Sequence, residues 1–329
     1  MMRNPKSFAV LGITGLGGLA LLAFFVREAM GSRPENQSLG KFPEKIVYVR
    51  TNDDVVDAGV VFTAATKPRK KTAVLWFHGW GANFYLPSYI GIGRALAERG
   101  FTTISCNTRM HDIGNVEKYE GDKRIRGGGY WGVTSEDARD IAAWIDYAER
   151  VGFKKVILVG HSAGWASVGR YQVDHQDSRV VGLVLASGMT GIATGGSGGP
   201  DPTVVKAKEL VDAGRSEELI PLPNRNFPSY ISAGTVLDDS RRPAEFGDFF
   251  GIKSSSPAAL RIHCPFLAFF GDNGDIAGQT ELDLVKASLK RLKGGPTRVD
   301  IATIRGGDHE YNGQEEQVAN VIASWAAKL

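Results

Sequence analysis

Apolar residues along most of this chain fall into short continuous runs, and these runs alternate with stretches in which apolar positions follow a helical period. Short apolar runs are typical of strands buried on both faces, and apolar positions three and four apart are typical of helices with one buried face. The stretch 134–150 places four apolar side chains on one such face: Ile141, Trp144, Ile145 and Ala148. Strands alternating with helices predict a mostly parallel sheet with helices on both faces.

The pattern gives a definite set of expected elements. The first two strands, 45–50 and 55–64, are separated by the polar turn 52–54, so we expect them to pair antiparallel. Further strands are expected at 73–77, 102–106, 156–159, 180–185, 266–270 and 299–304. Helices are expected at 91–99, 134–150, 163–173, 280–292 and 315–327.

One long stretch, about 188–256, breaks this alternation. It contains a glycine-rich segment, a cluster of prolines and one helical pattern around 203–212, but no run that reads well as a strand. So long an interruption predicts an inserted cap or lid rather than a plain connection. We therefore expect one folded domain over 43–329 that carries this cap, and we find no internal repeat.

The first 32 residues differ in kind from the rest. Residues 8–26 are apolar without a charge, and Arg3 and Lys6 precede them. At ~1.5 Å per residue this stretch is just long enough to cross a hydrocarbon core of ~30 Å. Because the following residues offer no good cleavage site, an uncleaved membrane anchor is favoured over a cleaved signal peptide or a helix buried in the domain. The basic residues would keep the N-terminus in the cytoplasm and the rest outside, and cleavage would instead release a secreted protein.

Composition excludes several classes of function. The 329 residues are 43% hydrophobic and 23% charged, and the formal net charge is only +3, which gives no reason to expect a nucleic-acid partner. Cys106 and Cys264 lie in or beside apolar runs, so we expect buried thiols rather than a disulfide. No spacing of ligands predicts a metal, and no glycine loop predicts a phosphate-bearing cofactor. The oligomeric state is left open.

A nucleophile is predicted from the string Gly-His-Ser-Ala-Gly at 160–164. With 41 glycines in the chain a Gly-x-Ser-x-Gly string arises easily by chance, so its context decides. This one follows the strand 156–159 and leads into a helix, the setting in which a sharp turn holds a serine above a sheet. A second match, around Ser197, has no strand before it. Ser162 is therefore the candidate nucleophile, and Ser197 is not.

A serine needs a base, and the base needs an orienting carboxylate. His309 follows the last strand, and a loop at the carboxyl end of a parallel strand lies at the edge of the sheet where Ser162 emerges. The loop after 266–270 offers two acids. Asp275 is favoured because an Asn-Gly turn would lift it out of the loop, while Asp272 is the alternative and could merely cap that turn.

An oxyanion formed at Ser162 would need backbone N–H donors. Position alone indicates the N–H of Ala163, at the start of the helix after the serine, and that of Trp80, in the loop after the strand 73–77. The loop 109–131 also begins on this side of the sheet. Its Arg109, Arg124 and Arg126 could hold an anionic group, although a solvated loop is the favoured interpretation.

These residues together resemble the α/β-hydrolase superfamily over about 43–329. The resemblance rests on His78-Gly79 after a strand, the string at 160–164, the acidic loop 271–276, and Asp308-His309 before the last helix. It implies an eight-stranded sheet with a cap inserted late in the chain. One departure concerns the acid, because Gly274 stands where the family often has it. A serine rather than an aspartate at position 162 argues against a dehalogenase or an epoxide hydrolase.

The resemblance and the residues lead to one expected activity. A serine hydrolase would cleave a small carboxylic ester through a Ser162–His309–Asp275 triad and an acyl-enzyme, with no cofactor. An amidase or acyltransferase using the same triad remains open. So does a non-catalytic interaction protein, since fold alone does not fix function.

Overall fold

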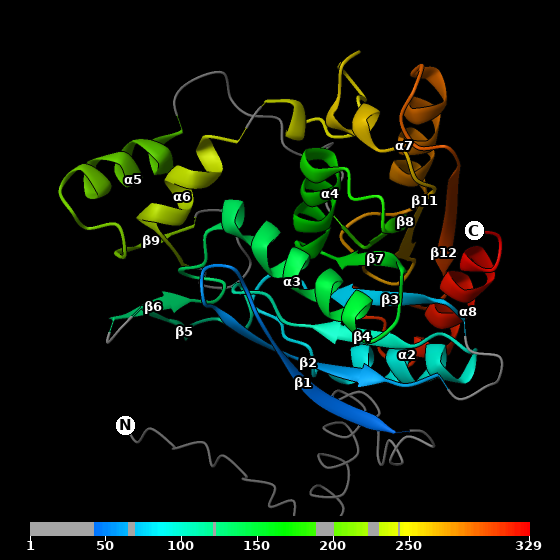
Figure 1. The fold of residues 1–329 in the computed structure, drawn as a ribbon. Helices are drawn as coiled ribbons and strands as arrows, with labels where there is room; N and C mark the ends of the chain where they lie inside the picture. Colours follow the sequence, from blue (N-terminus) through cyan, green and yellow to red (C-terminus); the bar gives the residue numbers. More distant parts are fainter. Residues whose placement is uncertain (1–42, 65–69, 121–122, 189–200, 223–229, 243) are drawn as a thin grey trace, which may run out of the picture. The chain divides into compact units, whose positions relative to one another are not determined.

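A computed structural model describes residues 43–64, 70–120, 123–188, 201–222, 230–242 and 244–329. Its centre is one sheet of eight strands in the order β1-β2-β4-β3-β7-β8-β11-β12 (Figure 1). The strands are β1 (Glu44–Arg50), β2 (Val56–Phe62), β3 (Thr72–Phe77), β4 (Thr103–Cys106), β7 (Lys155–His161), β8 (Val180–Ala186), β11 (Phe266–Gly271) and β12 (Val299–Ile304). Strand β2 pairs antiparallel with β1 and β4, and the other pairs are parallel. The expected fold class is confirmed.

Within the ranges that the structure describes, five helices cover the two faces of this sheet. They are α2 (Pro87–Glu98), α3 (Asp137–Arg150), α4 (Gly164–His175), α7 (Gln279–Arg291) and α8 (Glu315–Ala326). Apolar residues of α3, α4 and α7 share one core with Leu75 and Leu158, while those of α2 and α8 share the other with Trp76 and Val159. Consecutive residues of a strand therefore pack into opposite cores, because side chains alternate between the two faces of a sheet.

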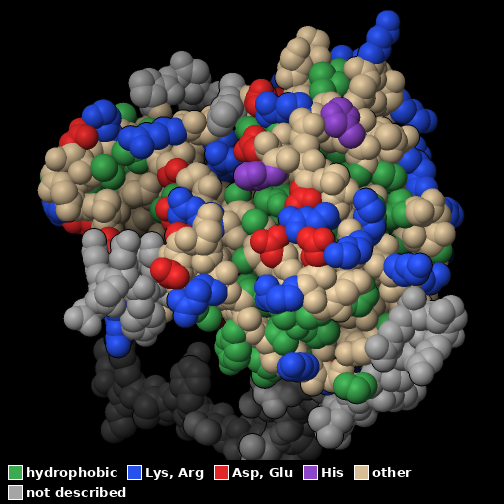
Figure 2. All heavy atoms as spheres, viewed as in Figure 1, with side chains coloured by type: hydrophobic (Ala, Val, Ile, Leu, Met, Phe, Trp, Pro, Cys, Tyr) green, Lys and Arg blue, Asp and Glu red, His purple; other side chains and the backbone are tan. Residues whose placement is uncertain are grey.

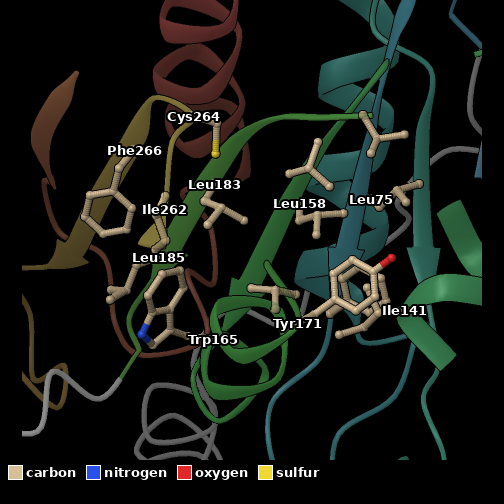
Figure 3. Packing of buried hydrophobic residues seen from close by; sticks show 14 of the residues in the cluster. Leu75, Ile141, Leu158, Trp165, Tyr171, Leu183, Leu185, Ile262, Cys264 and Phe266 are labelled. Carbon is tan, nitrogen blue, oxygen red and sulfur yellow. The ribbon is translucent and has the colours of Figure 1, made fainter. Parts of the chain in front are cut away.

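The first of these cores is shown from close by in Figure 3. Trp165 of α4 lies beside Leu185 of β8, and Cys264 lies near Leu183. Cys106 and Cys264 are both buried and unpaired, as expected from their apolar surroundings. On the face seen in Figure 2, acidic and basic side chains are interspersed, which agrees with the small net charge.

The segment between β4 and α3 contains structure that the sequence interpretation missed. Strands β5 (Asn115–Glu120) and β6 (Lys123–Gly127) form an antiparallel hairpin where a loop was expected. The strands carry mostly polar and charged residues, so no apolar alternation marks them. A short 3-10 helix, η1 (Thr134–Glu136), then leads into α3, so the α-helix begins three residues later than expected.

In the described part of the cap expected over 188–256, the structure has two helices, two strands and a 3-10 turn. They are α5 (Pro202–Asp212), β9 (Leu219–Pro221), β10 (Tyr230–Ser232), α6 (Ala233–Ser240) and η2 (Ala244–Phe246), and a further turn, η3 (Ala258–Arg261), follows. The prediction that this region lacks strands was wrong. Strands β9 and β10 pair antiparallel over three residues each, which is too short to leave a periodic signal.

The cap packs around a small core of its own and is tied to the segment before α3. Its core consists of Ala207, Leu210, Ile220, Ala233 and Val236. The N–H of Ser232 donates to the carbonyl oxygen of Tyr130 at 2.7 Å, and the hydroxyl of Thr235 donates to that of Gly132 at 2.9 Å. The hydroxyl of Ser135 also donates to Asp238 at 2.7 Å. The cap is thus fixed beside the start of α3.

The expected membrane anchor, 8–26, lies outside the described residues. Among the helices that the structure does describe, none combines the length and the apolar character needed to cross a bilayer. The anchor and the boundary at 32 therefore stay predictions.

Candidate active site

Ser162 occupies the tight turn between β7 and α4. Its φ is 51°, a left-handed conformation that non-glycine residues rarely adopt. The flanking glycines are required by space: a Cβ at Gly160 would lie 2.5 Å from the Cα of Trp165, and one at Gly164 would lie 2.4 Å from the carbonyl oxygen of His78. The strain at Ser162 is thus imposed by close packing of β7, α4 and the loop after β3, and it fixes the direction of the hydroxyl.

Ser162, His309 and Asp275 lie in one hydrogen-bonded series. Nε2 of His309 is 3.0 Å from Oγ of Ser162, and Nδ1 of His309 is 2.7 Å from Oδ1 of Asp275. The three come from the ends of β7, β12 and β11, which are parallel strands that end at the same edge of the sheet. The structure therefore brings together the three side chains that the sequence singled out.

Asp272, the alternative acid, points elsewhere. Its Oδ1 accepts the N–H of Gly306 at 2.6 Å, and the residue is exposed. The side chain of Asp275 is fully buried. Of the two acids in this loop, only Asp275 lies against His309, while Asp272 ties its loop to the one that follows β12.

The carboxylate of Asp275 is held by four donors. Besides His309, Oδ1 accepts the N–H of Ile276 at 2.7 Å, and Oδ2 accepts the N–H of Gly271 at 2.7 Å and the hydroxyl of Ser187. Burial alone would raise the pKa of Asp275, but these hydrogen bonds outweigh it and hold the pKa below its usual range. The group is therefore a fixed anion beside the imidazole at neutral pH.

The pKa of His309 is shifted in the opposite direction. Burial lowers it, but the hydrogen bond and charge of Asp275 and the nearby Glu310 more than offset this, so that the pKa lies above the ordinary 6.5. A carboxylate that stabilises the imidazolium makes the histidine a better proton acceptor. The electrostatics suit a base that takes a proton from Ser162.

Ser187 and Tyr311 support this series and were missed by sequence reasoning. Ser187, at the end of β8, contacts both Asp275 and the hydroxyl of Tyr311. Both residues are fully buried and both have positive φ, 49° and 59°. A lone serine and tyrosine carry no motif, so their positions emerge only when β8, β11 and the loop after β12 come together.

His161 and His78 hold the surrounding loops. Nε2 of His161 is 2.8 Å from the carbonyl oxygen of His309, and its Nδ1 is 2.7 Å from the hydroxyl of Tyr89 on α2. Burial, reinforced by His309, lowers the pKa of His161 to about 3, so this ring stays neutral. His78 bonds the backbone at Gly79 and Thr108 and so holds the loop after β3 to the loop after β4.

Ser162 opens into a cavity of about 420 Å³ between the sheet and the cap. Trp80 and Ala163, the predicted oxyanion donors, line the same cavity. Ala163 directly precedes α4, where backbone N–H groups point out of the helix. A Cβ at Gly79 would lie 2.9 Å from that of Ser162, so the loop carrying Trp80 runs directly beside the serine.

Arg109 is neither solvated nor available to an anion. It is 5% exposed and forms ion pairs with Asp53, Glu136 and Asp140 at 3.1, 2.8 and 2.8 Å. It locks the loop after β4 against α3 and the turn between β1 and β2. Ser197, the serine of the second Gly-x-Ser-x-Gly string, lies outside the described residues.

Comparisons with known proteins agree on the fold. Residues 72–203 match the family model of the α/β hydrolase fold. No curated protein matches the chain. Among solved structures, Est1E from Butyrivibrio proteoclasticus is 15% identical with a TM-score of 0.54, covering 86% of this chain and 98% of its own. An esterase of Pyrococcus furiosus is 15% identical with a TM-score of 0.55, covering 90% of this chain and 96% of its own. A hypothetical protein of Pseudomonas aeruginosa is 12% identical with a TM-score of 0.61, covering 88% of this chain and 94% of its own.

At these identities the solved structures establish the architecture alone. Together with the family match and the eight-stranded sheet, they make this chain an α/β-hydrolase-fold protein. The resemblance inferred from the sequence is confirmed.

Proposed function

We propose that this protein is a serine hydrolase that cleaves a small carboxylic ester through an acyl-enzyme. The observation that carries the proposal is the series Asp275–His309–Ser162, with contacts of 2.7 and 3.0 Å at the mouth of a cavity. The esterases among the solved structures of the same fold support it.

The chemistry follows from the geometry. Oγ of Ser162 attacks the ester carbonyl carbon while Nε2 of His309 takes its proton, and the carbonyl oxygen becomes an oxyanion stabilised by the N–H groups of Trp80 and Ala163. Collapse breaks the bond to the alkoxy group, which leaves as the alcohol with the proton from His309. Water then attacks the acyl-enzyme with His309 again as base, and the acid is released. Asp275 stabilises the imidazolium in both halves, and no step needs a cofactor.

The same series of residues would also serve an amidase or an acyltransferase. An ester is proposed because its alcohol leaves with the least assistance. A non-catalytic role on this fold is disfavoured because the carboxylate of Asp275 and the raised pKa of His309 are the features expected of a base prepared for proton transfer.

The proposal extends to location. The charge-free apolar stretch 8–26, preceded by basic residues, supports a membrane anchor that leaves the hydrolase domain outside the cytoplasm.

A fluorophosphonate probe tests the activity, because it reacts only with an activated serine. The wild-type protein should be labelled and should hydrolyse activated esters. Ser162→Ala should lose labelling and at least about 10³-fold of the turnover while remaining folded. Ser197→Ala, the matched control from the other string, should behave as wild type. Undiminished labelling of folded Ser162→Ala would remove the proposal.

A further inference from the structure

The cavity beside Ser162 has a largely apolar wall that also carries polar and charged residues. Trp165, Phe246 and Phe249 are among its apolar residues, and the cap contributes Leu222 and Ile231. Among the polar residues are Asp137 and Ser167, from the first turns of α3 and α4. These two residues have no part in the proposed reaction of Ser162.

Asp137 has an unsatisfied oxygen. The residue is 3% exposed, Oδ2 accepts the hydroxyl of Ser167 at 2.6 Å, and Oδ1 has no hydrogen-bonding partner among the described residues. A buried polar atom without a partner destabilises the folded protein, because it has lost its hydrogen bonds to water and gained none in return. A ligand in the cavity that supplied the missing hydrogen bond would recover this free energy, so the atom marks a point of recognition.

The electrostatics around Asp137 favour a neutral partner. Burial, followed by the nearby Asp140, raises the pKa of Asp137, so the carboxyl keeps its proton at pH values where an exposed aspartate has lost it. The hydrogen bond from Ser167 and the charge of Arg109 lower this pKa but do not offset the burial, and Asp239 of the cap adds a negative charge that opposes ionisation. A protonated carboxyl both donates and accepts hydrogen bonds.

The charged side chains that line the cavity are already paired. Arg242 donates to Asp239 at 2.8 Å, and Arg170 is 3.4 Å from Asp174. An ionic ligand of either sign would meet a like charge in this wall as well as an opposite one, so neither sign is selected. Arg242 also has a buried Nε without a partner among the described residues, so the wall offers a donor as well as the carboxyl. A neutral ligand group that both donates and accepts hydrogen bonds is complementary to this wall.

We propose that Asp137 and Ser167 form a specificity site for a hydroxyl group on the part of the ester that fills this cavity. The inference rests on the proposed function in taking the ligand to be an ester. It adds the class of substrate: an apolar chain or ring that carries a hydroxyl at a distance from the scissile bond. A site built around a hydroxyl rejects the analogue that lacks it, because the buried polar groups then stay unpaired.

The test compares esters that differ by one hydroxyl. One series pairs 4-nitrophenyl esters of alkanoic acids with those of their ω-hydroxy counterparts, over short and medium chains. A second series varies the alcohol part in the same way, as acetates of alkanols and of diols. The wild-type protein should prefer the hydroxylated member of at least one series by about tenfold or more in kcat/KM.

Variants separate recognition from structural damage because the measured quantity is the ratio of kcat/KM for the hydroxylated ester to that for its partner without the hydroxyl. Asp137→Leu should bring the preference close to one, and Asp137→Asn, which keeps a donor and an acceptor, should retain a good part of it. Asp57→Asn is the matched control, because Asp57 is a fully buried aspartate of β2 that does not line the cavity. It should leave the preference unchanged.

Binding to Ser162→Ala, followed by the fluorescence of the tryptophans in the wall, gives the same comparison without turnover. Hydrolysis with no preference in either series, or a preference that survives Asp137→Leu, overturns the specificity site and leaves the hydrolase standing. No hydrolysis but tighter binding of hydroxylated esters overturns the hydrolase and keeps the site. Absence of both hydrolysis and preferential binding overturns both.

Discussion

Replacing Asp275 by asparagine should be one of the most damaging single-atom changes in this protein. Both carboxylate oxygens accept hydrogen bonds: Oδ1 from Ile276 and His309, and Oδ2 from Gly271 and Ser187. An amide has one oxygen and one NH2 group, so in either orientation its NH2 faces a backbone N–H. That conflict leaves a buried donor unsatisfied and should cost about 1–3 kcal/mol of stability.

The loss of activity should be much larger than the loss of stability. With its NH2 toward His309, the asparagine donates to Nδ1, which places the ring proton on Nε2 and leaves no lone pair to accept the proton of Ser162. With its oxygen toward His309, the tautomer is right but the imidazolium loses its counter-charge. We expect a fall in kcat on the order of 10⁴-fold, equivalent to about 5.5 kcal/mol of transition-state stabilisation.

The assay is hydrolysis of an activated ester by purified variants whose folding has been checked by thermal unfolding, at a pH above the pKa of His309. Asp272→Asn is the matched control, because Asp272 lies in the same loop and is exposed, and the one side-chain contact described for it is with the N–H of Gly306. It should stay within a few-fold of wild type. A folded Asp275→Asn with activity within tenfold of wild type, or the reverse ranking of the two variants, would refute this reasoning.

Three further predictions concern stability, pH and the N-terminus. Arg109→Leu leaves Asp140 buried without its counter-charge and should lower the free energy of unfolding, measured in urea, by about 3–5 kcal/mol. Arg50→Leu removes an exposed ion pair and should change it by less than about 1 kcal/mol. Equal effects of the two substitutions would contradict the argument from burial. Because the base must be neutral and the pKa of His309 is raised, kcat/KM should climb with pH and reach half its plateau above pH 6.5. A midpoint below that value would show that the pKa of the titrating base is not raised. Full-length protein should pellet with membranes and resist extraction by salt, and removal of residues 1–32 should give a soluble, active enzyme; a soluble full-length chain, or an unfolded truncation, would place the apolar segment in the folded domain.

The strands of the sheet could be predicted because each one leaves an apolar pattern in its own stretch of sequence. Runs such as 73–77 and 156–159 are apolar throughout, and that pattern belongs to strands covered on both faces. The hairpin β5–β6 and the strands of the cap could not be predicted, since the first is polar and the second is only three residues long on each side. Their stability comes from tertiary contacts, which leave no period in the sequence.

Some residues of the candidate site could also be predicted from the sequence and others could not. Ser162 and His309 were predictable from their places after strands, and the choice between Asp275 and Asp272 required the three-dimensional path of one loop. Ser187 and Asp137 have no motif around them. Each becomes notable only through a partner far along the chain, 88 residues away for Ser187 and 30 for Asp137, so no local pattern reports them.

The position of His161 has a consequence for mechanical coupling within the site. This residue adjoins the nucleophile in sequence, yet its ring bonds the backbone of His309 on one side and Tyr89 of α2 on the other. The turn carrying the serine and the loop carrying the base are therefore braced against a single rigid ring. We expect a displacement of one loop to be transmitted to the other through this ring, which would limit changes in the distance that a proton must cross.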